Sequence, residues 1–411
     1  PRGAIHLDLK KIRTTIAKIT HSTPRIKLIK QARIDYYIID DQPQGPTRLI
    51  EHNQPIQPVN PLGENTYKQV IIGLDSSSSV IRTPFFNLVT IAASASSTLV
   101  PEIYDHPEIY TYQITPRFKQ PYIIVGTDTE LPEEGKGVTT RNPLGTPYGF
   151  KYSPERIADE YRAWIENWML SDPVHQATSK LKETGYKPII LLDGPLYQTP
   201  QLIAKMHVAG EASSIWKRIV EDRINLIQTY EEEGIPVIGV VKRVEQSTIL
   251  SHSHHYSKLV KAHCGVDLSY YSPPGDQALI HLLLSLGKCR YRQSEMMRTP
   301  LLEYKPGGYG LPKLFTYIVI PPSIWSKRVS NYRVYRIEFT RKTSRILRDN
   351  QLTPYQIIYL ETVRHGLPIP FSIKLSDRRA GMIAQALRNK LKQMLSGMNV
   401  PFTYDELTYH R

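Results

Sequence analysis

The stretch that most constrains the fold is Ile189 to Leu196, which reads IILLDGPL. A short, fully apolar run closed by Gly-Pro is typical of a buried central strand that ends in a turn. The run delivers one acidic residue, Asp193, at the point where the strand leaves the sheet. A carboxylate in such surroundings is costly unless a partner compensates its charge. The pattern therefore predicts a chemical role or a firm structural partner for Asp193.

A second strand of the same design lies upstream. Val70 to Leu74 (VIIGL) ends on Asp75, and four serines follow it. Two buried strands that each deliver one aspartate favour a shared divalent-cation site, because Mg²⁺ and Mn²⁺ prefer carboxylate oxygens and commonly serve phosphoryl chemistry. Either aspartate alone could instead cap a turn or a helix after its strand. The pair together favours a metal site.

The charge balance points to a polyanionic partner. The chain has 52 Lys and Arg against 38 Asp and Glu, a formal net charge of +14. Nucleic acid is the simplest such partner, and a basic protein with no nucleic-acid role is the alternative. Cys264 and Cys289 are the only cysteines, too few for a disulfide framework or a cysteine-rich zinc site. A reducing, cytoplasmic setting is expected, and no apolar segment is long enough to predict a membrane span.

A glutamate-bearing helix supplies a third candidate ligand. Ser153-Pro154 predicts the start of this helix, with Ser as N-cap and Pro at the first position. Glu160 borders its apolar stripe, whereas Glu166 falls on the opposite face. Glu160 is therefore the better third ligand. The alternative is a helix-flank glutamate that pairs with a nearby arginine.

Beyond the Asp193 strand the pattern predicts a βαβ unit. A long helix over 213–230 is followed by the apolar strand Ile235 to Val241, which leads directly into Lys242 and Arg243. Parallel, right-handed pairing would bring Asp193 and Lys242 to the same edge of the sheet. Lys242 would there hold a phosphate or stabilise developing charge, the alternative being a solvated lysine.

The chain as a whole is predicted to be α/β. Residues 1–64 are expected to form an amphipathic helix and an extended Pro/Gly-rich connection. Residues 65–395 would form the compact domain, and 396–411 a C-terminal tail. Residues 94–150 would be an insertion that includes a strand over 122–125 and a turn-rich surface loop over 128–148.

These motifs, taken in order, resemble those of the NurA family, prokaryotic and chiefly archaeal nucleases that process DNA ends. The resemblance covers most of residues 65–395. The matching positions are Asp75-Ser76-Ser77, Glu160, Asp193-Gly194-Pro195-Leu196, Val241-Lys242-Arg243 and Arg336-Ile337-Glu338.

The resemblance implies an RNase H-like mixed sheet flanked by helices and a homodimeric ring around DNA. It also implies manganese-dependent cleavage, with a 5′-to-3′ exonuclease and a single-strand endonuclease activity. The implied partner is a hexameric HerA-type ATPase.

Several positions depart from the family pattern. Ser76 replaces a glycine and Pro195 a serine, which changes turn geometry and spares the carboxylates. Where the family often has a catalytic histidine before the last helix, this chain has Asp377. The spacing between Glu160 and Asp193 is also long for the family, so Glu166 stays open as the ligand.

The leading interpretation is a metal-dependent DNA nuclease that acts on single- and double-stranded ends in end resection and repair. Asp75 and Asp193 would share Mn²⁺ or Mg²⁺, with Glu160 and Asp377 completing one or two sites for two-metal hydrolysis. Lys242 would lie beside the scissile phosphate. The residues expected to contact the nucleic acid are Lys242, Arg243, Lys288, Arg290 and Arg336.

Two alternatives differ in class or in substrate. One is a cleavage-incompetent, NurA-like protein that binds DNA and serves as an adaptor for a ring ATPase, motivated by the altered positions 76, 195 and 377. The other is an RNA-directed nuclease with the same acids, since recognition of the 2′-hydroxyl depends on pocket geometry.

Overall fold

A computed structural model gives the fold of the chain between residues 47 and 403. The residues described are 47–51, 53–60, 68–99, 103–110, 117–119, 121–128, 137–198, 210–245, 247–268, 273, 275–285, 295–305, 310–321 and 332–403. The predicted N-terminal helix and the candidate nucleic-acid residues Lys288 and Arg290 lie outside these ranges.

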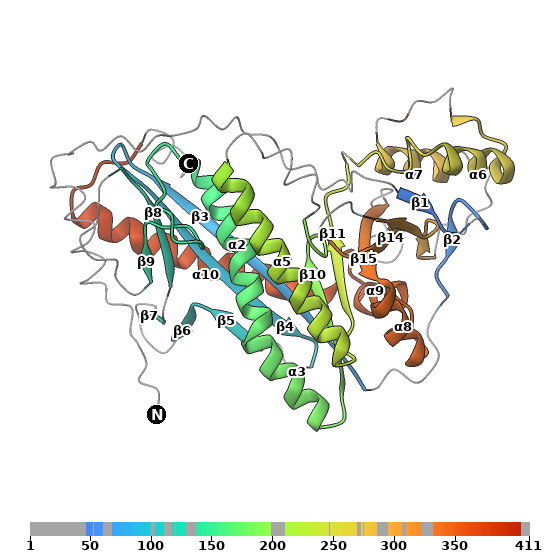
Figure 1. The fold of residues 1–411 in the computed structure, drawn as a ribbon, viewed down its shortest axis with the longest axis horizontal. Helices are drawn as coiled ribbons and strands as arrows, with labels where there is room; N and C mark the ends of the chain where they lie inside the picture. The colour runs from blue at the N-terminus through green and yellow to red at the C-terminus, as the bar shows by residue number, and fades with distance from the viewer. Residues whose placement is uncertain are drawn as a thin grey trace.

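A single large mixed sheet organises the molecule (Figure 1). Its centre is parallel, and antiparallel strands extend it on both sides. The central order is β8 (Tyr122–Gly126), β4 (Asn87–Ser97), β3 (Gln69–Arg82), β10 (Lys187–Asp193), β11 (Val237–Val241), β15 (Arg333–Thr340) and β14 (Lys313–Ile320).

Shorter strands complete the sheet or lie beside it. Those in the sheet are β1 (Thr47–Leu49), β2 (Gln57–Pro58), β5 (Tyr104–His106), β9 (Val138–Thr139), β12 (Met297–Arg298) and β13 (Leu302–Tyr304). A separate pair is formed by β6 (Glu108–Tyr110) and β7 (Arg117–Lys119).

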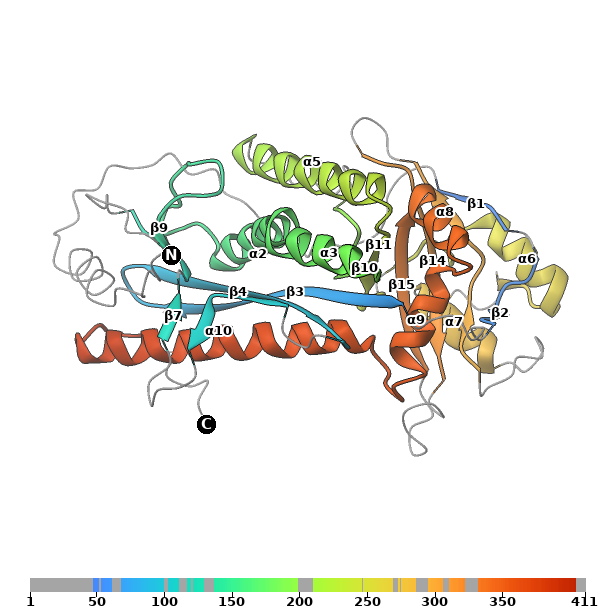
Figure 2. The ribbon, with the colours of Figure 1, turned by 90° about the horizontal axis from the view of Figure 1, so that it is seen from below.

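Helices cover both faces of the β3–β4 region (Figure 2). One layer contains α2 (Pro154–Ser171), α3 (Pro173–Glu183) and α5 (Gly210–Glu232), and the other is the long α10 (Phe371–Gly397). The remaining helices are α6 (His254–Cys264), α7 (Asp276–Ser285), α8 (Arg341–Asp349) and α9 (Pro354–Thr362). The α/β prediction is confirmed, and the order of β8, β4, β3, β10 and β11 is compatible with an RNase H-like core.

The two apolar strands are buried for the reason that the sequence suggested. In β3, Val70, Ile72 and Leu74 pack into the core beneath α2 and α5, while Ile71 faces the opposite core. Parallel strands covered on both faces lose the alternation of polar and apolar residues, since neither face meets water. The predicted βαβ unit is also confirmed, because β10 and β11 run parallel and α5 connects them.

A difference in strand length creates an opening in the sheet. β3 pairs with β10 only from Gln69 to Leu74, since β10 ends at Asp193. β3 continues to Arg82 with β4 on its other side. Among the residues that the structure describes, no strand takes the place that β10 vacates. Asp75 and Asp193 therefore lie at an opening bordered by both helical layers.

Two features differ from the sequence-based expectations. β1 pairs with β13 and β2 with β12, and Ile56 and Val59 are buried, so part of the expected extended connection belongs to the main sheet. Cys264 is disulfide-bonded, whereas the sequence analysis expected no disulfide framework.

Candidate metal centre

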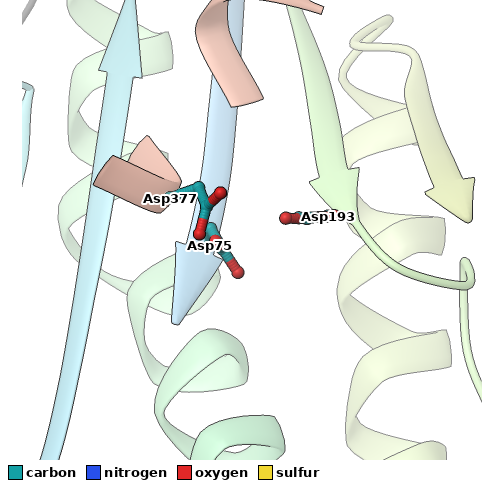
Figure 3. A group of neighbouring side chains, drawn as sticks. All are labelled: Asp75, Asp193 and Asp377. Carbon is teal, nitrogen blue, oxygen red and sulfur yellow. The ribbon is translucent and has the colours of Figure 1, made fainter. Parts of the chain in front are cut away.

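Three aspartates meet at the opening in the sheet (Figure 3). One carboxylate oxygen from each of Asp75, Asp193 and Asp377 lies within 4.8 Å of the others. Asp75 follows the last β3 residue paired with β10, and Asp193 is the last residue of β10, so parallel pairing places them side by side. Asp377 comes from α10, on one face of the sheet. The structure thus brings together Asp75, Asp193 and Asp377. The expectation that the first strand ends on Asp75 is wrong, because β3 continues to Arg82 with β4 as its partner, and only Asp193 ends its strand.

A close approach between α10 and β3 delivers Asp377. A Cβ on Gly73 would lie 2.3 Å from the carbonyl carbon of Ser372, so only glycine leaves room for the helix. The buried Glu361 accepts a hydrogen bond of 2.7 Å from the Ser372 N–H at the start of α10. After Asp377, Arg379 pairs through two nitrogens with Asp105 of β5. The part of α10 that carries Asp377 is therefore held on both sides, at Ser372 and at Arg379.

Close backbone packing and a buried glutamate fix the turn that follows Asp193. Gly194 has a φ of 133°, and the following chain crosses so close to β11 that a Cβ on Gly239 would lie 2.4 Å from the Leu196 nitrogen. Glu338 of β15 accepts this N–H at 3.1 Å and pairs with Lys313 at 2.5 Å. Burial alone would raise the pKa of Glu338, but Lys313 and Arg336 lower it below its ordinary value. An ionised, buried carboxylate thus anchors the turn.

The cluster concentrates negative charge in a buried place. Burial, then Asp193 and then Glu166 raise the pKa of Asp75 from 3.8 to about 9, against the opposing effects of Arg162 and Lys242. Burial also raises the pKa of Asp193. Carboxylates that resist ionisation in the free protein are those that a bound cation would stabilise most.

Two basic side chains border the cluster on different sides. The Lys242 Nζ lies 2.5 Å from Asp193 and 3.7 Å from Asp377. Burial lowers the pKa of Lys242, but Asp193, Asp377 and Asp75 outweigh burial and raise it. On the α2 side, an Nη of Arg162 lies 3.9 Å from Asp75. The predicted placement of Lys242 beside Asp193 is found in the structure.

Glu160 lies away from this cluster. Its buried carboxylate accepts hydrogen bonds from Tyr148, Tyr152 and Arg156. Glu166 is the one that faces the cluster, since it accepts from the Ser76 hydroxyl and raises the pKa of Asp75. Glu166 falls on the face opposite the apolar stripe, as the sequence predicted, but α5 packs on α2, so this helix is covered on more than the side of that stripe.

The predicted nucleic-acid residues divide into three groups. Arg243 is exposed at the end of β11, next to Lys242. Lys288 and Arg290 lie outside the described residues. Arg336 is corrected, because it is 1% exposed and its Nε donates to Glu338 at 2.9 Å. Strand alternation suggested exposure for Arg336, but β15 lies inside the sheet between β11 and β14, where the arginine serves as a buried counter-ion.

Arg162 is the neighbour of the cluster that the sequence analysis missed. Its Nε donates to the carbonyl and the hydroxyl of Ser76. The available signal was its position four residues before Glu166, which puts both side chains on one face of α2. Since the structure shows that this face of α2 borders the cluster, Arg162 is expected beside it as well.

The donor set fits a hard divalent cation. Carboxylate oxygens from three separate elements converge, and Mg²⁺ and Mn²⁺ take such ligands together with water. Asp75, Asp193 and Asp377 would hold the ion, with Glu166 near enough to take part through Ser76 or a water.

The two glutamates can be separated by substitution. We expect Glu160→Gln to destabilise the fold by about 1–3 kcal/mol, because it weakens a buried network, and to leave Mn²⁺ affinity unchanged. Glu166→Gln should weaken Mn²⁺ binding about 10-fold or more, because it removes charge beside Asp75. Isothermal titration with Mn²⁺ on both variants decides the question. Equal losses of Mn²⁺ affinity would contradict the assignment.

Comparison with known proteins gives the family. A family model described as "NurA domain" matches residues 69–380, which contain all three aspartates of the cluster. The chain belongs to the NurA family. No curated protein matches the sequence.

Three solved structures are similar to this NurA chain. The NurA nuclease of Sulfolobus solfataricus is 10% identical at a TM-score of 0.41, over 85% of this chain and 89% of that one. A NurA structure with manganese is 9% identical at a TM-score of 0.34, over 83% and 90%. An Argonaute of Marinitoga piezophila with 5′ OH guide RNA is 10% identical at a TM-score of 0.26, over 77% and 30%.

None of the described helices of this NurA chain is long and apolar enough to cross a bilayer.

Proposed function

We propose that this NurA-family chain is a metal-dependent nuclease that hydrolyses phosphodiester bonds in DNA. The observation that carries the proposal is the convergence of Asp75, Asp193 and Asp377, with Lys242 beside them, within the segment that matches the NurA domain. The similarity to a NurA structure with manganese supports Mn²⁺, with Mg²⁺ as the alternative.

Each residue of the site has a role that follows from its position. The three aspartates would fix one or two cations at the opening beside β3. Bound there, the metal would lower the pKa of a water for attack and neutralise the leaving oxygen. Lys242 would contact a non-bridging oxygen of the scissile phosphate, since its ammonium lies between Asp193 and Asp377. Arg162 would do the same from the α2 side.

The finer features of the function rest on the family resemblance and are proposals. They are 5′-to-3′ exonuclease and single-strand endonuclease action, two-metal hydrolysis, a role in DNA end resection and repair, and cytoplasmic location. A homodimer and a hexameric HerA-type ATPase are the proposed partners.

Cleavage of end-labelled DNA tests the proposal. We expect purified protein with Mn²⁺ to cut single- and double-stranded DNA, EDTA to stop it, and Asp193→Ala to be inactive with DNA binding largely retained, because phosphate contacts elsewhere carry affinity. Arg348→Gln, on the exposed face of α8, serves as a control that should cut normally. Wild-type rates in Asp193→Ala would overturn the assignment, and preferential cutting of a matched RNA would change the substrate.

The adaptor without cleavage is the second candidate function. It is favoured by a single observation, the aspartate in place of the family histidine. An adaptor has no need to hold a cation between Asp75 and Asp193, so Mn²⁺ binding by the purified protein distinguishes the two.

A further inference from the structure

The aspartate cluster is most accessible to solvent at Asp377. The Asp377 side chain is 56% exposed, whereas those of Asp75 and Asp193 are 4% and 9% exposed. Asp377 belongs to α10, which covers one face of the sheet (Figure 2 and Figure 3). A substrate that approaches a cation held by the cluster therefore passes close to the solvent-exposed face of α10.

Two exposed basic side chains lie next to Asp377 on this helix. Lys374 is three residues before it, and Arg378 directly follows it. Neither side chain forms a hydrogen bond or an ion pair with any residue in the described ranges. The charge of the cluster is offset by Arg162 and Lys242 instead. Lys374 and Arg378 are therefore available to bind an anion beside the cluster.

The arrangement of these two cations opposes helix stability. Lys374 and Arg378 are four residues apart, so they are neighbours on the helix surface, and like charges at this spacing repel each other. Arg379, by contrast, pairs through two nitrogens with Asp105 of β5. A local arrangement that costs stability without a compensating contact is typical of a functional site.

The surface of α10 beside these residues carries no side chain at Gly381, which lies four residues after Asp377 and three after Arg378. Glycine in the middle of a helix is destabilising relative to alanine. Packing does not require glycine here, since an added Cβ would meet nothing within 4 Å. Its effect is to leave room for the backbone of another polymer to lie close to the helix.

We propose that Lys374 and Arg378 bind the phosphate next to the scissile phosphodiester of a polynucleotide whose backbone crosses α10 at Gly381. The proposal rests on the proposed function and names a requirement of its substrate, a second phosphate beside the bond that is cut. Ammonium and guanidinium groups form charge-assisted hydrogen bonds with phosphate oxygens. Phosphate contacts carry no sequence information, so the requirement is independent of the bases.

Cleavage of short substrates of equal length tests the requirement. We expect the full chain with Mn²⁺ to cut a thymidine trinucleotide roughly 10-fold more efficiently than the same trinucleotide with one neutral methylphosphonate linkage. The double variant Lys374→Gln/Arg378→Gln should cut the charged trinucleotide only as well as the wild type cuts the neutral one. The four values of kcat/KM form a cycle that isolates the coupling between the two cations and the phosphate.

Lys342→Gln/Arg348→Gln is the matched control, because it makes the same two charge changes at exposed positions of α8. It should keep the full difference between the two trinucleotides. Thermal melting of both double variants checks folding. Lys374→Gln/Arg378→Gln should melt no lower than the wild type, because it removes a like-charge pair.

Gly381→Gln tests the room beside the helix. Glutamine is a better helix former than glycine, so the melting temperature should rise. Its side chain would occupy the space assigned to the polynucleotide, so cleavage of the charged trinucleotide should fall several-fold while Mn²⁺ affinity stays unchanged. A purely structural role for Gly381 predicts no loss of cleavage in a variant that is more stable.

The outcomes separate this requirement from the proposed function. If the wild type with Mn²⁺ cuts neither trinucleotides nor longer DNA, the nuclease proposal fails. Binding of a labelled oligonucleotide of about 15 nucleotides, with Ca²⁺ in place of Mn²⁺, then decides the phosphate contact. Lys374→Gln/Arg378→Gln should weaken this binding and reduce its salt slope by about one, with no change in the α8 control.

Three results would overturn the proposal. They are an undiminished difference between the trinucleotides in Lys374→Gln/Arg378→Gln, an equal loss in the α8 control, and an unchanged salt slope where binding is the measurement.

Discussion

Asp75→Asn should abolish Mn²⁺-dependent cleavage and at the same time stabilise the metal-free protein. Burial and the neighbouring acids raise the pKa of Asp75 from 3.8 to about 9. A raised aspartate pKa means that ionisation opposes folding, so stability is lost as the pH rises from about 4 towards 9. Asparagine removes that charge with little change of shape. We expect a gain on the order of 2–4 kcal/mol near pH 8 that vanishes near pH 4.

The same substitution removes a proposed metal ligand. Cleavage with Mn²⁺ should fall roughly 1,000-fold. The rise in melting temperature that Mn²⁺ gives the wild type should disappear, because a ligand stabilises a protein only through the affinity of the folded state. Calorimetry between pH 5 and pH 8, with and without Mn²⁺, measures both effects.

Asp105→Asn is the matched control. Asp105 lies on β5 in the same row of the sheet, but it is compensated by Arg379 and the Ser94 hydroxyl. Its replacement should therefore destabilise the protein, with no gain towards high pH. A loss of stability in Asp75→Asn at pH 8 would show that the charge of the cluster is compensated in the metal-free protein, and would count against a cation site there.

Gly73→Ala should displace α10 and with it Asp377. A Cβ at this position would lie 2.3–2.6 Å from backbone atoms of Ser372 and Ile373, which cannot rotate away as a side chain could. We expect a loss of about 3 kcal/mol or more in the free energy of unfolding, measured by urea denaturation. Protein that remains folded should bind Mn²⁺ no better than Asp377→Ala.

Gly381→Ala is the control for Gly73→Ala. It lies further along α10, and an added Cβ there meets nothing within 4 Å. Alanine should stabilise the helix by about 0.5–1 kcal/mol and leave Mn²⁺ affinity unchanged. If both glycine variants unfold at the same urea concentration and bind Mn²⁺ equally, the close approach of α10 to β3 does not position Asp377.

The central strands and the aspartates that follow their apolar runs were predictable because the signal is local. A strand covered on both faces must be apolar at every position, so VIIGL and IILLDGPL stand out from the rest of the chain. The connection between β10 and β11 then fixes parallel pairing, and parallel pairing places Asp193 and Lys242 at one edge. None of these steps needs a contact between distant residues to be known in advance.

Helix faces were harder to predict, because their environment depends on what packs against them. The apolar stripe of α2 favoured Glu160, but α5 covers a second side of the helix. On that side Glu166 pairs with Arg223 of α5 and accepts a hydrogen bond from the Ser76 hydroxyl beside the cluster. Arg336 shows the same effect in a strand. The alternation of polar and apolar residues predicts which face of the strand its side chain lies on, but not whether that face meets water or a buried carboxylate such as Glu338.

The sequence by itself determined the α/β class, the two apolar strands that carry Asp75 and Asp193, and the lysine beside Asp193, since each follows from local periodicity and chain connectivity. Only the tertiary structure decided that Asp377 joins the cluster and that one edge of β3 stays open. Both depend on how closely elements approach and where they stop. Gly73 has no side chain and so allows α10 to approach β3 closely. β10 ends at Asp193 after seven residues, whereas its neighbour β3 continues to Arg82. The distances between such elements are set by packing between segments that lie hundreds of residues apart in the sequence. No local sequence pattern encodes that packing.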